Sequence, residues 1–304
     1  MKKIAFLING TAKRKEILKL KLINKFDNYQ LSFHVSTYAG EAVEFAQEVI
    51  NNRIDYLIVV GGDGTINEVV NGCMKCQKVL LDTISIGVLP YGSGNDFSKS
   101  LGIKKDLDQL KKLIENNISG PVDIGKIDYI NSDDQRESRY FINITDVGIG
   151  GVAAEKLSKS RRLMGAKITY HKVILQSFFS YKPVEIDIKS DAIKWKGKIL
   201  SLCMANGNYF ANGMCIAPQA NLSDGKIQLV IMGKVSIFDY IKNLSNVKKG
   251  KILEHPEITY VKVDSCIIDA KKRSCPIDMD GEFIGYAPLE LKVIKAGLNF
   301  LQIN

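Results

Sequence analysis

The sequence predicts an α/β domain followed by a β-rich domain, and two patterns support this prediction. Up to Pro121, short apolar runs alternate with segments whose apolar residues recur every three or four positions, as in parallel strands joined by helices. Beyond it, runs such as Val184–Ile188 alternate apolar and polar residues, as in antiparallel strands with one wet face. We therefore expect a three-layer domain with a mostly parallel sheet over residues 1–122. We expect a β-sandwich over residues 123–294, with residues 295–304 returning to the first domain.

The central feature of the first domain is a strand, a glycine turn and a helix. The apolar run Tyr56–Val60 is typical of a strand buried on both faces, and it leads into Gly61-Gly62-Asp63-Gly64-Thr65. A helix is predicted next, because apolar residues recur at i, i+3, i+4 and i+7: Ile66, Val69, Val70 and Cys73. Glycines before a helix N-terminus let backbone N–H groups approach an anion, and an acid there indicates magnesium. The residues alone also allow a tight turn in which Asp63 or Thr65 caps the helix.

The remaining elements follow from the same two periodicities. The first half contains three further strands and two further helices: Ile4–Ile8, Phe33–Ser36 and Ile84–Leu89, then Glu41–Ile50 and a helix marked by Leu107, Leu110 and Ile114. The second half contains helices over about residues 153–180 and 235–247, and strands that include Tyr140–Ile144. Asn9, Asp63 and Asp96 all follow strands, where ligands bind in open parallel sheets.

Charge and composition narrow the class of partner. The net charge of the 304-residue chain is 42 − 33 = +9, which favours an anionic partner such as a nucleotide, a nucleic acid or a membrane surface. No aromatic RNA-binding signature accompanies the basic clusters, so we expect no nucleic acid. No apolar run approaches the roughly 18 residues of a membrane span. The six cysteines show no second pair at zinc-finger spacing, and we expect a cytoplasmic protein.

Six ordered motifs resemble one family of kinases. Gly61–Thr65 with Asn67 and Glu68 resembles the nucleotide-binding signature that diacylglycerol kinases, sphingosine kinases and NAD kinases share. Pro90–Phe97 is similar to the Gly-Thr-x-Asn-Asp-Phe segment of diacylglycerol kinases, with Ser93 in place of the threonine. Four further matches follow: Val122–Gly125, Ala205–Met214, Ala217–Gly225 and Asp280–Glu282. The resemblance spans nearly the whole chain and is closest to bacterial soluble lipid kinases of the diacylglycerol kinase type.

This resemblance implies a fold, a reaction and a set of site residues. The fold would be that of NAD kinases and diacylglycerol kinases. The reaction would be Mg²⁺-dependent transfer of the ATP γ-phosphoryl group to a lipid hydroxyl, most simply that of diacylglycerol, giving phosphatidic acid. Asp63 and Glu282 would be catalytic, with Glu282 as the general base. The residues implied for ATP are Asn9, Thr11, Thr37, Gly61, Gly62, Asp63, Gly64, Thr65, Asn67, Glu68, Ser93 and Asn95. Asp63, Asp96 and Asp123 would surround the catalytic Mg²⁺, and Asp224 with the carbonyls of Asn221 and Lys226 would hold a structural Mg²⁺.

Several alternatives stay open at this level. Ser223-Asp224-Gly225 and Asp280-Gly281-Glu282 can both be plain turns, since Asp-Gly is a strong turn signal. The family's first loop reads Asn-Pro-x-Ser-Gly, whereas this chain has Asn9-Gly10-Thr11-Ala12-Lys13, which leaves the nucleotide affinity open. The competing functions are an NAD or other small-molecule kinase and a non-catalytic lipid-binding regulator. For a lipid kinase we expect transient association with an anionic membrane surface; a homodimer is left open.

Overall fold

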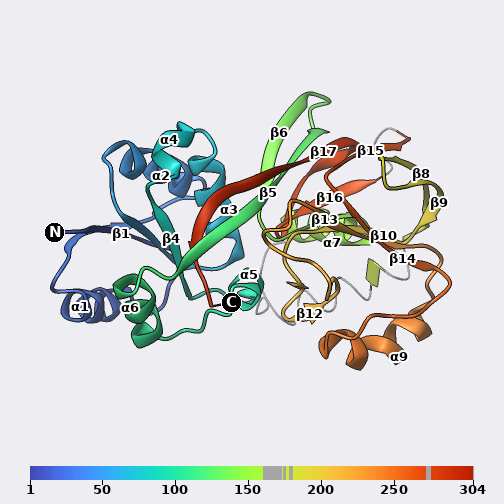
Figure 1. Ribbon diagram of the computed structural model, residues 1–304. Coiled ribbons are helices and arrows are strands. Elements are labelled where there is room, and N and C mark those ends of the chain that lie inside the picture. The colour runs from blue at the N-terminus through green and yellow to red at the C-terminus, as the bar shows by residue number, and fades with distance from the viewer. Residues whose placement is uncertain (160–172, 174–175, 178–180, 272–274, 304) are drawn as a thin grey trace. The chain divides into compact units, whose positions relative to one another are not determined.

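The computed structural model describes residues 1–159, 173, 176–177, 181–271 and 275–303. The chain forms two compact units: Met1–Asp123 with Ala296–Asn304, and Ile124–Lys295 (Figure 1). It passes from one unit to the other within two strands, β5 (Ser119–Ile130) and β17 (Glu282–Leu301). The predicted boundaries, after residues 122 and 294, each fall one residue before those of the units. The predicted pairing of an α/β architecture with a β-rich one is confirmed.

The first unit is built on a parallel sheet. Its strands are β1 (Lys3–Ile8), β2 (Gln30–Val35), β3 (Tyr56–Gly61) and β4 (Ser85–Pro90). Their order is β4-β3-β1-β2, with the end of β17 beside β4, and the pairs are parallel. Every residue of β3 is buried, which explains why its sequence is continuously apolar rather than alternating.

Helices cover both faces of this sheet, so the unit has the expected three layers. The helices are α1 (Lys15–Lys25), α2 (Glu41–Asn51), α3 (Asp63–Cys73), α4 (Lys78–Leu81), α5 (Asp96–Ser100) and α6 (Leu107–Glu115). In Figure 1, α2, α3 and α4 lie on one side of the sheet, and α1 and α6 on the other. Close packing of α3 on α2 requires Gly72, because a Cβ there would lie 2.4 Å from the carbonyl oxygen of Val43.

The last residues of the chain complete the first unit. Phe300, near the end of β17, pairs in parallel with Ile86 of β4. Its ring contacts that of Phe97 in α5, with the ring centroids 5.4 Å apart. The Ile303 N–H donates to the carbonyl of Leu101, just after α5. The C-terminus thus supports the short helix that follows the second glycine loop.

The second unit is an antiparallel β structure. Its strands are the remainder of β5, β6 (Arg136–Phe141), β7 (Ile144–Gly148), β8 (Val184–Lys189), β9 (Lys194–Ile199), β10 (Ser201–Ala205), β11 (Tyr209–Phe210), β12 (Met214–Cys215), β13 (Ile227–Met232), β14 (Ile258–Val263), β15 (Ser265–Ala270), β16 (Pro276–Met279) and most of β17. Its described helices are α7 (Ile149–Lys159) and α9 (Ile237–Lys248). The layer β14-β13-β10-β7-β16 packs against strands β8, β15 and β17 through one apolar core, as in a sandwich.

The elements differ from the sequence prediction at one helix and one strand. Helix α1 was not predicted. The expected strand Tyr140–Ile144 is wrong: β6 ends at Phe141 and β7 starts at Ile144, because the backbone between them turns toward Asp280. Of the expected helix over residues 153–180, α7 covers the beginning, and most of the remainder lies outside the described residues. Among described residues, no helix is both long and apolar enough to cross a bilayer.

Phe300→Ala tests the support that the C-terminus gives to α5. The ring is fully buried, so its removal should lower the free energy of unfolding by about 3–5 kcal/mol. Ile303→Ala is the matched control, because Ile303 is exposed and its loss should cost less than about 0.5 kcal/mol. Guanidinium denaturation measures both. Equal, small effects would show that the C-terminal segment is not anchored by Phe300.

Candidate functional site

The two glycine loops of the first unit touch through their backbones. Gly61 ends β3 and Gly62 precedes α3, while Gly92 lies in the loop after β4. A Cβ on Gly92 would lie 2.4 Å from the Cα of Gly62, and a Cβ on Gly62 would lie 2.9 Å from the Cα of Gly92. Glycine at both positions is therefore required for the loops to meet at the carboxyl ends of β3 and β4.

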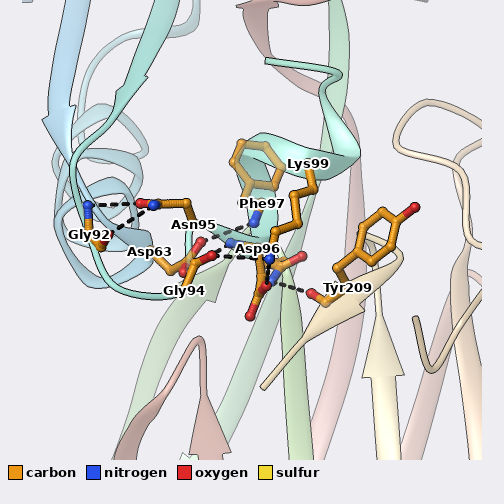
Figure 2. Close-up of polar contacts among 9 residues, drawn as sticks. Asp63, Gly92, Gly94, Asn95, Asp96, Phe97, Lys99 and Tyr209 are labelled. Carbon is orange, nitrogen blue, oxygen red and sulfur yellow. Dashed lines mark hydrogen bonds and ion pairs between the residues drawn. The ribbon is translucent and has the colours of Figure 1, made fainter. Parts of the chain in front are cut away.

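The carboxylate of Asp63 joins these loops. It accepts the backbone N–H groups of Asp96 at 3.1 Å and Phe97 at 3.0 Å, the first two residues of α5 (Figure 2). Asp63 does not cap its own helix: the residue before α3 is Gly62, and no side chain caps that end. The sequence interpretation in which Asp63 or Thr65 caps the following helix is therefore wrong. Burial raises the pKa of Asp63, while the two N–H groups oppose the rise.

A second carboxylate lies beside the first. Asp96 is 5% exposed and pairs with the Lys99 ammonium at 2.7 Å. A Cβ on Gly94 would lie 3.1 Å from one oxygen of Asp63 and 3.4 Å from one of Asp96, so both carboxylates border the Cα of this glycine. Two largely buried acids share one lysine here. This donor set fits a hard cation such as Mg²⁺, which takes one or two carboxylates together with substrate phosphates.

The third predicted ligand is not part of that pair. Asp123 is 1% exposed, and its carboxylate accepts the N–H of Ala296 at 2.7 Å, where β17 re-enters the first unit. Within the described ranges, no three His, Cys, Asp or Glu side chains lie close enough together to hold a metal ion. Asp63 and Asp96 are brought together, whereas the predicted trio with Asp123 is not assembled as a protein-only metal site.

The loop after β1 contacts the start of α3. Asn9 Nδ2 donates to the Thr65 hydroxyl at 2.7 Å, and Asn9 Oδ1 accepts the N–H and hydroxyl of Thr11. Thr37 donates its N–H and its hydroxyl to Glu41, and this N–H lowers the pKa of Glu41. The loop Asn9–Lys13, which departs from the family sequence, thus still connects the end of β1 to the start of α3 through a hydrogen bond.

These residues line one groove in the first unit. Its volume is about 640 Å³, which lies within the range of small-ligand pockets. The lining is Asn9, Gly10, Thr11, Lys15, Glu16, Val35, Ser36, Thr37, Tyr38, Ala39, Thr65 and Glu68. Five residues predicted for ATP are among them: Asn9, Thr11, Thr37, Thr65 and Glu68. Hydroxyl and amide groups at the ends of parallel strands, beside a helix N-terminus, suit a phosphate-bearing ligand.

The other residues predicted for ATP do not line this groove. Asn95 hydrogen-bonds both backbone groups of Gly92 and so holds its own loop in shape. Asn67 is 1% exposed and accepts hydrogen bonds from Asn71, and Gly64 lies within α3. Ser93 is exposed on the second loop. Lys15 and Tyr38 line the groove but were not assigned to ATP. The sequence signal for Lys15 is a basic run after a strand and a short Gly/Thr loop, which fits either a phosphate-facing corner or a solvated loop, and that for Tyr38 is only that it follows a strand.

In the second unit, the turn before β17 is held by a buried carboxylate. Asp280 accepts three backbone N–H groups, from Ile142 at 3.0 Å, Asn143 at 3.1 Å and Ile144 at 2.9 Å. Asp280 itself has φ 49° and Gly281 has φ 91°, so the turn adopts a conformation that L side chains rarely take. The Asp280 carboxylate therefore fixes a strained turn rather than being an exposed acid.

Glu282, the residue that follows this turn, remains accessible. Its side chain is 44% exposed, and its carboxylate pairs with the Arg139 guanidinium at 2.6 Å. Asp278 accepts the N–H of Gly281 at 2.9 Å from the other side of the turn. Burial raises the pKa of Asp278, and the nearby Asp146 carboxylate adds to the rise. Asp280 is thus buried within the turn, whereas the Glu282 side chain reaches solvent.

The predicted structural magnesium site does not fit the observed contacts. One oxygen of Asp224 pairs with the Lys262 ammonium, and the other accepts the Lys226 N–H at 3.1 Å. Asn221 accepts from the N–H and hydroxyl of Ser223 through its side chain. The Lys262 ammonium already supplies a positive charge at Asp224, so these contacts do not favour a metal ion there.

Comparison with known proteins identifies the class. Residues 3–127 match the family model of the diacylglycerol kinase catalytic domain, and residues 143–302 match that of the YegS C-terminal NAD kinase beta sandwich-like domain. A crystal structure of a diacylglycerol kinase from Bacillus anthracis str. Sterne has a TM-score of 0.73 at 19% identity, covering 99% of this chain and 97% of that one. The chain thus has the architecture of a two-domain kinase.

Sequence relatives define the family. The chain is 30% identical over 297 residues to the diacylglycerol kinase of Bacillus subtilis (strain 168), covering 95% of this chain and 93% of the relative. It is 30% identical over 301 residues to that of Staphylococcus carnosus (strain TM300), covering 97% and 94%. The chain belongs to the diacylglycerol kinase family. It is therefore an enzyme, a kinase acting on a lipid, and the non-catalytic interpretation is set aside.

The NAD kinase alternative has weaker support. Yeast NADH kinase complexed with NADH has a TM-score of 0.51 at 10% identity, covering 98% of this chain and 82% of that one. A likeness at that level concerns the fold alone.

Asp63→Asn separates a metal ligand from a helix cap. Asn keeps one of the two acceptors for α5 but loses the charge, so turnover should fall by about 10–100-fold, as for damage to a metal site. The free energy of unfolding should fall by only about 1 kcal/mol. Asp106→Asn is the control, because Asp106 caps α6 by accepting the Asp108 N–H away from the groove. Turnover as high in Asp63→Asn as in Asp106→Asn would restrict Asp63 to capping.

Proposed function

We propose that this kinase transfers the γ-phosphoryl group of ATP to the hydroxyl of diacylglycerol, giving phosphatidic acid, in a Mg²⁺-dependent reaction. The observation that carries the proposal is the groove of the first unit, lined by Asn9, Thr11, Thr37, Thr65 and Glu68. These are residues that the family resemblance assigns to ATP, and they converge although they are dispersed in the sequence. The named relatives are diacylglycerol kinases, which favours that lipid over other acceptors.

The first unit would bind the nucleotide. Hydroxyls of Thr11, Thr37 and Thr65 would donate to phosphate or ribose oxygens, and the N-terminus of α3 would favour the negative charge. Gly61 and Gly62 would act by letting Thr65 and Gly92 pack closely against the loop, and Gly64 adds no side chain at the start of α3. Ser93 would donate its hydroxyl from the second loop, which Asn95 holds in shape. Asn67 contributes by fixing α3, since it is buried against Asn71.

Asp63 and Asp96 would hold the magnesium ion, and Asp123 is the third acid that the family resemblance implies for this set. When bound, Mg²⁺ neutralises charge on the phosphate oxygens and orients the transferring group. The chain's own contribution is to keep two carboxylates side by side, which the N–H groups of Asp96 and Phe97 achieve for Asp63.

The acceptor hydroxyl must lose its proton as it reacts. Its oxygen forms a bond to the γ-phosphorus, the bond from that phosphorus to the β,γ-bridging oxygen breaks, and ADP leaves. The hydroxyl proton would pass to the Glu282 carboxylate, which Arg139 orients through the pair at 2.6 Å. Because phosphoryl transfer passes through a loose transition state, positioning and charge should contribute more than the base.

The partners follow from this reaction. A lipid acceptor requires that the protein visit a bilayer, and its charge of +9 favours an anionic surface. We propose transient membrane association of a cytoplasmic enzyme. The proposal includes no nucleic acid, and a homodimer stays an open prediction.

An acceptor panel tests the proposed reaction directly. Purified protein, Mg²⁺ and labelled ATP are incubated separately with diacylglycerol, polyprenol, ceramide, a sphingoid base and NAD. We expect label in phosphatidic acid, and we expect its loss when EDTA is added, because the phosphates need the cation. Label in NAD and in none of the lipids would contradict the assignment. Label in another lipid would retain a lipid kinase but replace the acceptor.

Glu282→Gln tests the general base. Gln keeps the size and can still accept from Arg139, so ATP affinity and stability should stay near wild type, while kcat should fall by about 10²–10⁴-fold. Glu290→Gln is a matched control, because Glu290 forms a similar pair with Arg136 on the same unit. Steady-state kinetics and nucleotide binding are measured on both. A drop in kcat below about fivefold would remove Glu282 from the mechanism.

A further inference from the structure

One wall of the groove lies beyond the end of a strand. Strand β2 ends at Val35, and Ser36 extends its pairing by one step, because the Ser36 N–H donates to the carbonyl of Ile8 at 3.0 Å. The next three residues, 37–39, line the groove and lead toward α2. The conformation of a segment that has left its sheet depends on the partners that its backbone N–H groups find.

The carboxylate of Glu41, the first residue of α2, is that partner. Its Oε2 accepts the N–H of Thr37, the Thr37 hydroxyl at 3.0 Å and the N–H of Tyr38 at 3.4 Å. The Thr37 N–H lowers the pKa of Glu41, which keeps the group ionised at neutral pH. Hydrogen bonds to an ionised acceptor are stronger than those between neutral groups. One charged oxygen thus holds both residues of the wall.

Glu41 is itself fixed in place. Its other oxygen lies 2.8 Å from His34 Nε2 on β2, and the His34 ring stacks on that of Phe45 in α2, with the centroids 4.5 Å apart. Gly40 has φ 92°, a conformation that turns the chain so that Glu41 reaches back to Thr37. The Glu41 side chain is only 14% exposed. Because both the strand and the helix restrain this carboxylate, it holds the wall in one arrangement.

Glu41 acts on a ligand through the residues that it holds. Of the described residues, those that line the groove include Thr37 and Tyr38 but not Glu41. The charge of Glu41 is directed to the donors of the wall and to His34. Ser36, on the near side of the wall, has a separate restraint, since its hydroxyl accepts the Gly10 N–H at 3.1 Å. Loss of the Glu41 carboxylate should therefore release Thr37 and Tyr38 while the strand end stays in place.

We propose that Glu41 is a positioning residue for the nucleotide, and that it orders Thr37 and Tyr38 before ATP enters the groove. This inference rests on the proposed function, because ATP is the ligand proposed for the groove. Ordering a segment in advance removes an entropic cost that the ligand would otherwise meet, so it raises affinity. Since Glu41 does not touch the reacting atoms, its loss should raise the Kd and the KM for ATP together and leave kcat at saturating ATP nearly unchanged.

Two substitutions at this position test the role. Glu41→Ala removes the acceptor, and the Kd for ATP, measured by calorimetry on the full chain with Mg²⁺, should rise about tenfold or more. Glu41→Gln keeps an amide oxygen that can accept from Thr37, so its Kd should stay within about threefold of wild type. The KM for ATP should follow the Kd in both variants, with kcat within about twofold of wild type.

Glu48→Ala is the matched control, because it removes the same charge from an exposed position about two turns further along α2 and should bind ATP as the wild type does. Melting temperatures show that each variant is folded. An unchanged Kd in Glu41→Ala would overturn the inference, and with a lowered melting temperature it would show that the contacts serve folding alone. Equal losses of affinity in Glu41→Ala and Glu41→Gln would also contradict it, since the retained acceptor would then have no effect.

The wild-type measurement separates this inference from the function on which it rests. A wild-type protein that binds no ATP would overturn the proposed function and the role of Glu41 together. ATP binding by the wild type with an unaffected Glu41→Ala variant would overturn the role of Glu41 alone. Because calorimetry needs no lipid acceptor, a failed acceptor panel would leave this result unchanged.

Discussion

Two hydrogen bonds join the two glycine loops of the first unit: those that the Asp63 carboxylate accepts from the backbone N–H groups of Asp96 and Phe97. Helix α5 spans only Asp96–Ser100 and is too short to be stable alone. The Asp63 carboxylate stabilises it by accepting two of its N-terminal N–H groups and by placing negative charge at the positive end of the helix dipole. The close contact between Gly62 and Gly92 brings the two loops near enough for the Asp63 side chain to contact α5. Once α5 is fixed, the buried Asp96 carboxylate lies beside the half-buried Asp63, and a pair of acids is a donor set that a hard cation prefers.

The second unit uses the same physical device for a different purpose. Asp280 accepts three backbone N–H groups and holds a turn whose φ angles are unfavourable for L residues. Burying a carboxylate is costly unless its oxygens are hydrogen-bonded, and the three N–H groups meet this need for Asp280. The role of Asp280 is therefore to stabilise the backbone conformation of the turn. Glu282 remains half-exposed with Arg139. The buried Asp280 thus fixes the turn while Glu282 stays accessible, and Asp63 in the first unit likewise fixes a neighbouring element, the N-terminus of α5.

Sequence periodicity predicted the elements whose burial is one-sided or complete. Strand β3 and helix α3 were predicted because a continuous apolar run and an i, i+3, i+4, i+7 pattern each correspond to one kind of element. The break between Phe141 and Ile144 could not be predicted, because its cause is a carboxylate 138 residues beyond Ile142 in the chain. The partners of Asp63 and the lysine at Asp224 escaped prediction for the same reason: both depend on tertiary contacts. The position of Asn9 at the groove agrees with the rule that parallel strands present their ends at one edge, whereas Thr37 and Thr65 were assigned to ATP by the family resemblance.

Helix α1 was missed because its apolar residues do not form a single face. A helix is recognised in sequence by the contrast between an apolar and a polar face, and this one carries Leu18 and Leu22 inward and Ile17 and Leu20 outward. Its apolar residues therefore show no helical period. In a buried helix that pattern is ordinary, but α1 lies at the surface, where leucine exposed to water contributes nothing to folding. The exposed Ile17 and Leu20 thus hide the helical period in the sequence without adding to the stability of the fold.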